Sequence, residues 1–197
     1  MFIKKLQTQM QPLKRGKFIR DEEGSISIEA MIIMPMMFWT FLSLFSIFDA
    51  FHSYSINQKA AYTIGDAVSR ETQPLDNDYI DGMWGLFNYL AQTDADGAMR
   101  ITSVVYDAGQ DRFEVDWSQI RGSAAVLSTS ELTSSAASVT AWKARLPIIP
   151  DGERVMLVET WDTYDAPFST GLEQQVIHNR IYTRPRYAPR VCWLACN

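Results

Sequence analysis

The sequence predicts an α+β protein in which a long N-terminal transmembrane helix continues into a head built around an antiparallel sheet. Three patterns predict this fold: an uncharged apolar run near the N-terminus, an apolar stripe at helical spacing after it, and strand-like alternation from about residue 99 onward. The 197 residues, 47% of them hydrophobic, suffice for one domain and an appendage. We therefore expect a leader at 1–24, a transmembrane helix at 25–49, its continuation at 50–71 and a head at 72–197.

The apolar run extends over nineteen residues, from Ala30 to Phe48. At 1.5 Å per residue it is about 28 Å long, close to the roughly 30 Å hydrocarbon core of a bilayer. It has no polar stripe, so we do not expect it to lie flat on a membrane. Pro35 stands one turn inside, where transmembrane helices tolerate proline. The alternatives are a buried core helix and a secretory signal peptide, although signal peptides usually have a shorter apolar core.

The charges on either side of the run predict its orientation. Six basic residues and no acidic residue precede residue 21, whereas Lys59 is the one basic residue in the first twenty positions after Phe48. The positive-inside rule therefore places the N-terminus in the cytoplasm and residues from about 50 onward across the membrane. Beyond Ala30 the chain carries 12 basic and 19 acidic residues, a balance of -7, as expected for a translocated soluble part. In a bacterium this predicts a single-pass inner-membrane protein with a periplasmic head.

A glutamate stands at the start of the run, where a charge is costly. A charged residue at the centre of a transmembrane helix costs about 2.5–3.5 kcal/mol, and less near the end. Cleavage after Gly24 would give Ser25 a free ammonium about one helical turn from Glu29. In a fibre, Glu29 of one subunit would neutralise the new N-terminus of its neighbour. The alternative is an uncleaved anchor in which the Glu29 carboxylate reaches the interface among Lys17 and Arg20.

The order of basic leader, Gly24, Glu29 and apolar helix resembles the class III signal of type IV pilin-like proteins. Within that group, the segment EEGSISIEAMIIMPMMFWTFLSLFSIFDAF, with Glu29, Ala30 and Pro35, is similar to the TadE-like family of minor pseudopilins of the tight-adherence (Tad) pilus. The similarity is concentrated in about residues 22–65. Weaker similarity to longer members covers 146–147, 151–159 and 184–187.

This resemblance implies a pilin-like fold and a role in pilus biogenesis, adherence and biofilm formation. The implied partners are the lipid bilayer, a prepilin peptidase, other pilin-like subunits and the inner-membrane platform of the pilus. The family's cleavage site maps onto Gly24 and Ser25 and its assembly glutamate onto Glu29. Ser25 departs from the bulkier residue of the family.

The remaining segments predict the elements of the head. An apolar stripe at three- and four-residue spacing extends one helix from Ile26 to about Arg70. Residues 72–77 break it, and Asp78 is expected to cap a second short helix. Strands are predicted at Met99–Asp107, around Phe113 to Trp117, at Ser138–Leu146 and at Arg154–Tyr164, with a loop or weak helix over 122–138. Their short connections favour antiparallel pairing, with one sheet face on the helix.

The C-terminal segment mixes arginine with aromatic residues and contains both cysteines. The four arginines at positions 180–190 belong to an acidic, exported domain and do not suit nucleic-acid binding, so we expect them to pair with carboxylates of the head. Cys192 and Cys196 are four residues apart, and a helical placement would bring their Cα atoms within bridging range. In an oxidising compartment this favours a small-loop disulfide. Two free thiols or a bridge between subunits are the alternatives.

No pattern in the sequence points to catalysis. Phosphate-binding loops, His-Glu-x-x-His, Gly-x-Ser-x-Gly and C-x-x-C are all absent. His52 and His178 are expected to be surface groups. Asp76, Asp78 and Asp81 lack the glycine and final glutamate of a calcium loop, so we expect no metal and no cofactor. The prediction is a non-catalytic assembly protein; the alternative is a permanently anchored periplasmic binding or adhesion domain that is never processed.

Overall fold

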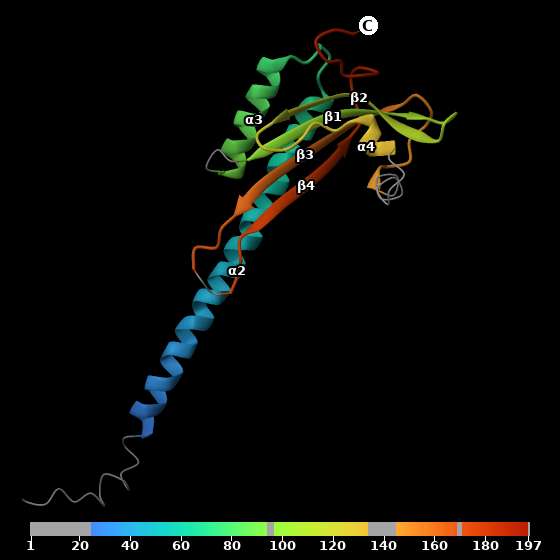
Figure 1. The fold of residues 1–197 in the computed structure, drawn as a ribbon. Helices are drawn as coiled ribbons and strands as arrows, with labels where there is room; N and C mark the ends of the chain where they lie inside the picture. The colour runs from blue at the N-terminus through green and yellow to red at the C-terminus, as the bar shows by residue number, and fades with distance from the viewer. Residues whose placement is uncertain (1–24, 94–96, 134–144, 169–170, 197) are drawn as a thin grey trace, which may run out of the picture. The chain divides into compact units, whose positions relative to one another are not determined.

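The computed structural model describes residues 25–93, 97–133, 145–168 and 171–196. It divides into two units, Met1–Phe45 and Ser46–Asn197. Gly24 and the rest of the predicted leader lie outside the described residues. The α+β class is confirmed, with one long apolar helix near the N-terminus and a four-stranded antiparallel sheet (Figure 1).

The N-terminal helix α2 extends from Ser25 to Ser69, as the apolar pattern predicts, and Pro35 lies inside it without ending it. Its last turn tightens, because the Arg70 amide donates to the Ala67 carbonyl at 3.1 Å. The second helix, α3, spans Asn77–Ala91. Its N-cap is Asp76 and not Asp78, because the Asp76 carboxylate accepts the Tyr79 amide at 2.8 Å. Asp78 lies in the first turn, where its charge suits the helix dipole.

The sheet contains β1 (Ala98–Asp107), β2 (Arg112–Arg121), β3 (Arg154–Tyr164) and β4 (Gln175–Thr183), in the order β2-β1-β3-β4 (Figure 1). All three pairings are antiparallel. Ser103 pairs with Trp117 and Val104 with Val115, so Asp116 is the extra residue of a β-bulge. A short helix, α4 (Thr129–Thr133), follows β2.

Two strand predictions differ from the structure. Most of the predicted strand Ser138–Leu146 lies outside the described residues, and its last two residues, Arg145 and Leu146, are not in a strand. The fourth strand is instead β4, which the sequence interpretation missed. Its core-facing residues Ile177 and Ile181 are separated by the polar Asn179, which weakens the alternating pattern.

Apolar side chains cover both faces of the sheet. On one face, residues of β1, β3 and β4 pack with α2 and α3 around buried Ile64, Phe87 and Ile101. On the other face, Val104 and Leu157 pack with Leu127, Leu132 and Leu146. The predicted contact between one sheet face and the long helix is therefore confirmed, and a second, smaller core lies behind the sheet.

Candidate functional site

The predicted processing segment is only partly described. Gly24 lies outside the described residues, and Ser25 is the first residue of α2. Glu29 lies one turn further on with an exposed side chain. In the described part of the chain no ion pair involves Glu29. The Glu29 carboxylate is therefore accessible to another molecule, as the predicted assembly role requires.

Most of the large apolar side chains that the structure describes in the first unit are exposed. Met31 is 77% exposed, Phe38 65% and Trp39 60%. A core helix of a soluble protein would be mostly buried, whereas only 6% of the most apolar 18-residue stretch of α2 is buried. By length and composition α2 is a candidate membrane span, compatible with a single-pass membrane protein.

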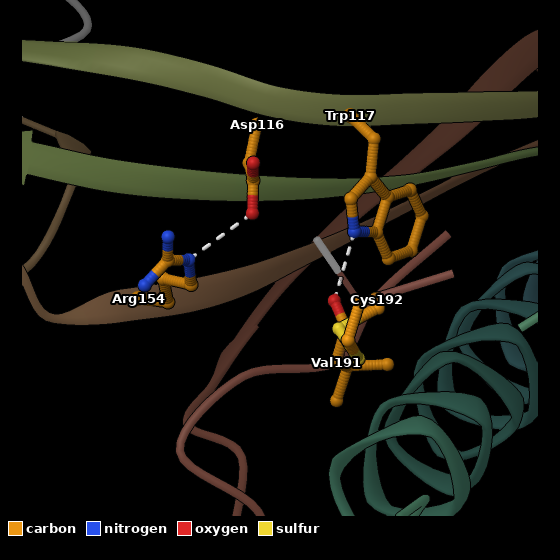
Figure 2. Close-up of a disulfide and its surroundings, with 6 residues drawn as sticks. Asp116, Trp117, Arg154, Val191 and Cys192 are labelled. Atoms are coloured by element: carbon orange, nitrogen blue, oxygen red, sulfur yellow. Dashed lines mark hydrogen bonds and ion pairs between the residues drawn. A yellow bond between two sulfur atoms is a disulfide. The ribbon is translucent and has the colours of Figure 1, made fainter. Parts of the chain in front are cut away.

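A disulfide joins Cys192 and Cys196, with their Cα atoms 5.3 Å apart. This confirms the predicted pairing, although not in the helical placement that the spacing suggested. The segment is an irregular turn in which Leu194 adopts a positive φ of 58°. Figure 2 shows Trp117 of β2 beside the bridge, with its indole N–H donating to the Val191 carbonyl at 2.9 Å.

The disulfide loop also contacts the connection between α2 and α3. The Leu75 amide donates to the Cys192 carbonyl, and the Leu194 amide donates to the Leu75 carbonyl, each at 2.8 Å. The ring centroids of Trp117 and Trp193 lie 6.0 Å apart. The C-terminal segment is thus attached both to the sheet and to the loop that precedes α3.

We expect removal of this disulfide to cost less stability than removal of a disulfide that closes a long loop. A loop of about five residues restricts the unfolded chain only slightly, so Cys192→Ser with Cys196→Ser should lower the free energy of unfolding by about 2 kcal/mol. Urea denaturation of the full chain with and without dithiothreitol would measure the loss. Dithiothreitol should have no effect on the double variant, because the sequence contains only these two cysteines. A loss of 4 kcal/mol or more would contradict the short-loop argument.

The sheet face that carries Val104 and Leu157 also contains a cluster of charged side chains, which the sequence interpretation missed. Glu159 of β3 is fully buried. Its carboxylate accepts a hydrogen bond from Nε of Arg100 on β1 and another from Nε of Arg180 on β4, each at 2.8 Å. Arg100 also donates from Nη1 to the Ala125 carbonyl at 2.7 Å and lies over the Trp161 ring. We call Arg100, Glu159, His178 and Arg180 the Glu159 cluster.

His178 completes this cluster as a neutral group. Its ring is stacked on Trp161 with the centroids 4.7 Å apart, and Nε2 lies 3.3 Å from Glu159 Oε1. Burial lowers the pKa of His178 and Arg180 lowers it further, while Glu159 acts in the opposite direction, and the net lowering favours the neutral imidazole. His178 is thus an exposed residue, as the sequence predicts, and its ring also contacts the Glu159 cluster.

A polar cavity of about 490 Å³ lies between α2, the end of α3 and the end of β3. Its wall includes Asp49, Asn57, Asp162, Tyr164 and Asp165. The Tyr164 hydroxyl donates to Asp49 Oδ2 at 2.9 Å, and Asn57 Nδ2 donates to Asp162 Oδ2 at 2.8 Å. Sequence reasoning missed this site because its residues come from distant segments. We call it the acidic cavity.

The other residues singled out in the sequence cap a helix, form ion pairs or lie exposed on the surface. Asp76 caps α3 and Asp81 pairs with Arg121, while within the described residues no group of three metal-ligating side chains occurs. Two C-terminal arginines pair with carboxylates as predicted, Arg184 with Glu153 and Arg186 with Asp66, each at 3.1 Å. His52 is exposed on α2 at the wall of the acidic cavity.

Comparison of the chain with protein-family models, with curated proteins and with solved structures gave no match. Its function is therefore inferred from its own residues.

Proposed function

We propose that this chain is a non-catalytic minor pseudopilin, anchored in the bacterial inner membrane, cleaved after Gly24 and assembled with other pilin-like subunits of a Tad-type pilus. The observation that carries the proposal is the order of features along the sequence. A leader with six basic residues precedes Gly24, helix α2 begins at Ser25, and Glu29 lies one turn inside it before the apolar run.

The exposed apolar surface supports assembly. Side chains such as Met31, Phe38 and Phe41 are more than half exposed, and contact with water would be unfavourable over such a length of helix. A bilayer satisfies this surface before assembly, and the helices of other subunits satisfy it in a fibre. Both environments are apolar, so moving from one to the other requires little change in the solvation of these side chains.

The carboxylate of Glu29 gives the assembly its register. In an apolar helix bundle an unpaired carboxylate is costly, and an ammonium at Ser25 of a neighbouring subunit would compensate it. Because the ammonium exists only after cleavage, an unprocessed subunit would lack the partner for this pair. Processing would thereby license assembly.

Processing is tested by mass spectrometry of the full chain purified from cells with and without a prepilin peptidase. We expect an N-terminus at Ser25 only where the peptidase is present. Gly24→Val should abolish the cleavage, because a branched side chain would not fit a protease subsite matched to glycine. Gly16→Val, a matched change within the leader, should leave it intact. An N-terminus at Met1 in both strains would instead favour the permanently anchored protein.

A further inference from the structure

The end of strand β3 is attached to the segment of α2 where the apolar run ends. Tyr164, the last residue of β3, is buried, and its hydroxyl donates to Asp49 Oδ2 at 2.9 Å and lies 3.3 Å from the Ser46 carbonyl oxygen. Burial and the hydrogen bond to Asp49 raise the pKa of Tyr164 to about 12, so the hydroxyl keeps its proton at neutral pH. Ser46, Phe48 and Asp49 belong to the same unit as the sheet. The chain that follows β3 therefore begins beside the last turn of the apolar run.

This chain is the connection between β3 and β4, of which the structure describes residues 165–168 and 171–174. Figure 1 shows the connection beside α2. The C-terminal segment is attached to a different part of the helix, because the Arg186 amide donates to the Ser69 carbonyl at 2.8 Å. Ser69 lies about 30 Å from Phe48 along α2, at 1.5 Å per residue. The connection and the C-terminal segment thus lie at opposite ends of the helix part that packs on the head.

Bulky apolar side chains are exposed where the connection meets α2. Phe168 of the connection is 42% exposed. Val176, which pairs with Thr163 at the start of β4, is more than half exposed, and so are Phe48 and Phe51 of α2. Contact of so much apolar surface with water is unfavourable, so a group of exposed side chains of this kind indicates an interaction surface.

A lipid surface is the partner that fits this position. If the apolar run spans a bilayer, Phe48 lies at the edge of the hydrocarbon core, and side chains at the same level lie in the interface, where aromatic residues are enriched. The connection also carries two exposed carboxylates, Asp165 and Glu173, which anionic headgroups would repel. Its chemistry therefore suits a zwitterionic lipid surface better than an anionic one.

We propose that the β3–β4 connection inserts Phe168 into the interface of a zwitterionic bilayer, with Val176 beside it, next to the end of the apolar run. The head then has two attachments to the membrane, α2 and this connection, and their separation fixes its tilt. The proposal rests on the membrane anchoring of the proposed function, and it does not depend on cleavage after Gly24 or on pilus assembly.

Photo-crosslinking of the full chain in phosphatidylcholine vesicles tests this contact. The photoreactive residue p-benzoylphenylalanine replaces one aromatic side chain at a time, and mass spectrometry detects lipid or protein adducts after irradiation. We expect lipid adducts at position 168 and at position 48, the positive control. We expect none at position 187, because Tyr187 is equally aromatic and 67% exposed but follows Arg186 at the far end of α2.

Two variants measure the contribution of Phe168 itself, with the photoreactive residue at position 172. Phe168→Ser should lower the yield of the lipid adduct about tenfold, because most of the apolar area that favours insertion is lost, whereas Phe168→Leu should retain most of it. Lipid adducts at position 48 but not 168, protein adducts in place of lipid at 168, or equal yields for the two variants would overturn the contact and leave the anchor in place. Absence of lipid adducts at every position would overturn the anchor as well.

Discussion

Replacing Glu159 by glutamine should lower the free energy of unfolding by about 3–5 kcal/mol, the largest stability loss that we expect from a single neutralised charge in this chain. The carboxylate is fully buried and accepts hydrogen bonds from two guanidinium groups. Its removal leaves the cation of Arg100, whose side chain is 11% exposed, without a counter-charge. Burying an uncompensated charge costs more than the original pair contributes.

Urea denaturation of the full chain, followed by tryptophan fluorescence, measures this loss. Glu114→Gln is the matched control, because Glu114 forms an ion pair with Arg112 at the surface. The Glu114 side chain is 35% exposed and the Arg112 side chain 41%. Solvent screens that pair, and its removal should cost less than about 1 kcal/mol. A second variant at this position, Glu159→Leu, should also lose stability. Adding Arg100→Leu to it should recover part of that lost free energy of unfolding, because the unpaired Arg100 cation is then removed. Equal losses for Glu159→Gln and Glu114→Gln would refute the buried-charge interpretation.

The sequence predicts the parts of this fold that a one-dimensional pattern determines. Helix α2 is such a part, because its apolar run is long enough to cross a bilayer and the stripe that follows repeats at helical spacing. Strand β3 also matches the predicted bounds Arg154–Tyr164. By contrast, the cap of α3 is two residues earlier than expected, since both Asp76 and Asp78 have suitable side chains and only the backbone geometry distinguishes them.

The Glu159 cluster and the acidic cavity could not be predicted in the same way. Arg100 and Arg180 flank Glu159 because the register pairs both of them with it across neighbouring strands. That register depends on β4, whose polar residues conceal its strand pattern. The cavity likewise brings Asp49 and Asn57 of α2 beside Asp162 and Asp165, more than a hundred residues later. The spacing of residues in the sequence carries no information on contacts between such distant segments.

Replacing Glu29 by glutamine should leave membrane insertion intact and reduce assembled pili by more than a hundredfold. The neutral amide inserts more easily than the carboxylate, because it lowers the cost of placing this residue near the apolar core. Under the proposed pairing, assembly would be reduced, because the Ser25 ammonium of a neighbouring subunit would lose its counter-charge. A loss of about 3 kcal/mol for a broken buried pair corresponds to a factor of more than a hundred in an equilibrium constant.

Membrane fractionation would measure insertion of this variant, and immunoblotting of sheared fibres would measure assembly. Glu23→Gln is the control, because it removes a carboxylate six residues earlier, in the leader that the proposed cleavage would remove. Glu29→Asp should retain part of the assembly, because the charge remains on a shorter side chain. If Glu29→Gln assembled as well as Glu23→Gln, the exposed carboxylate of α2 would have no part in subunit contact, and the apolar surface alone would have to set the register of the fibre.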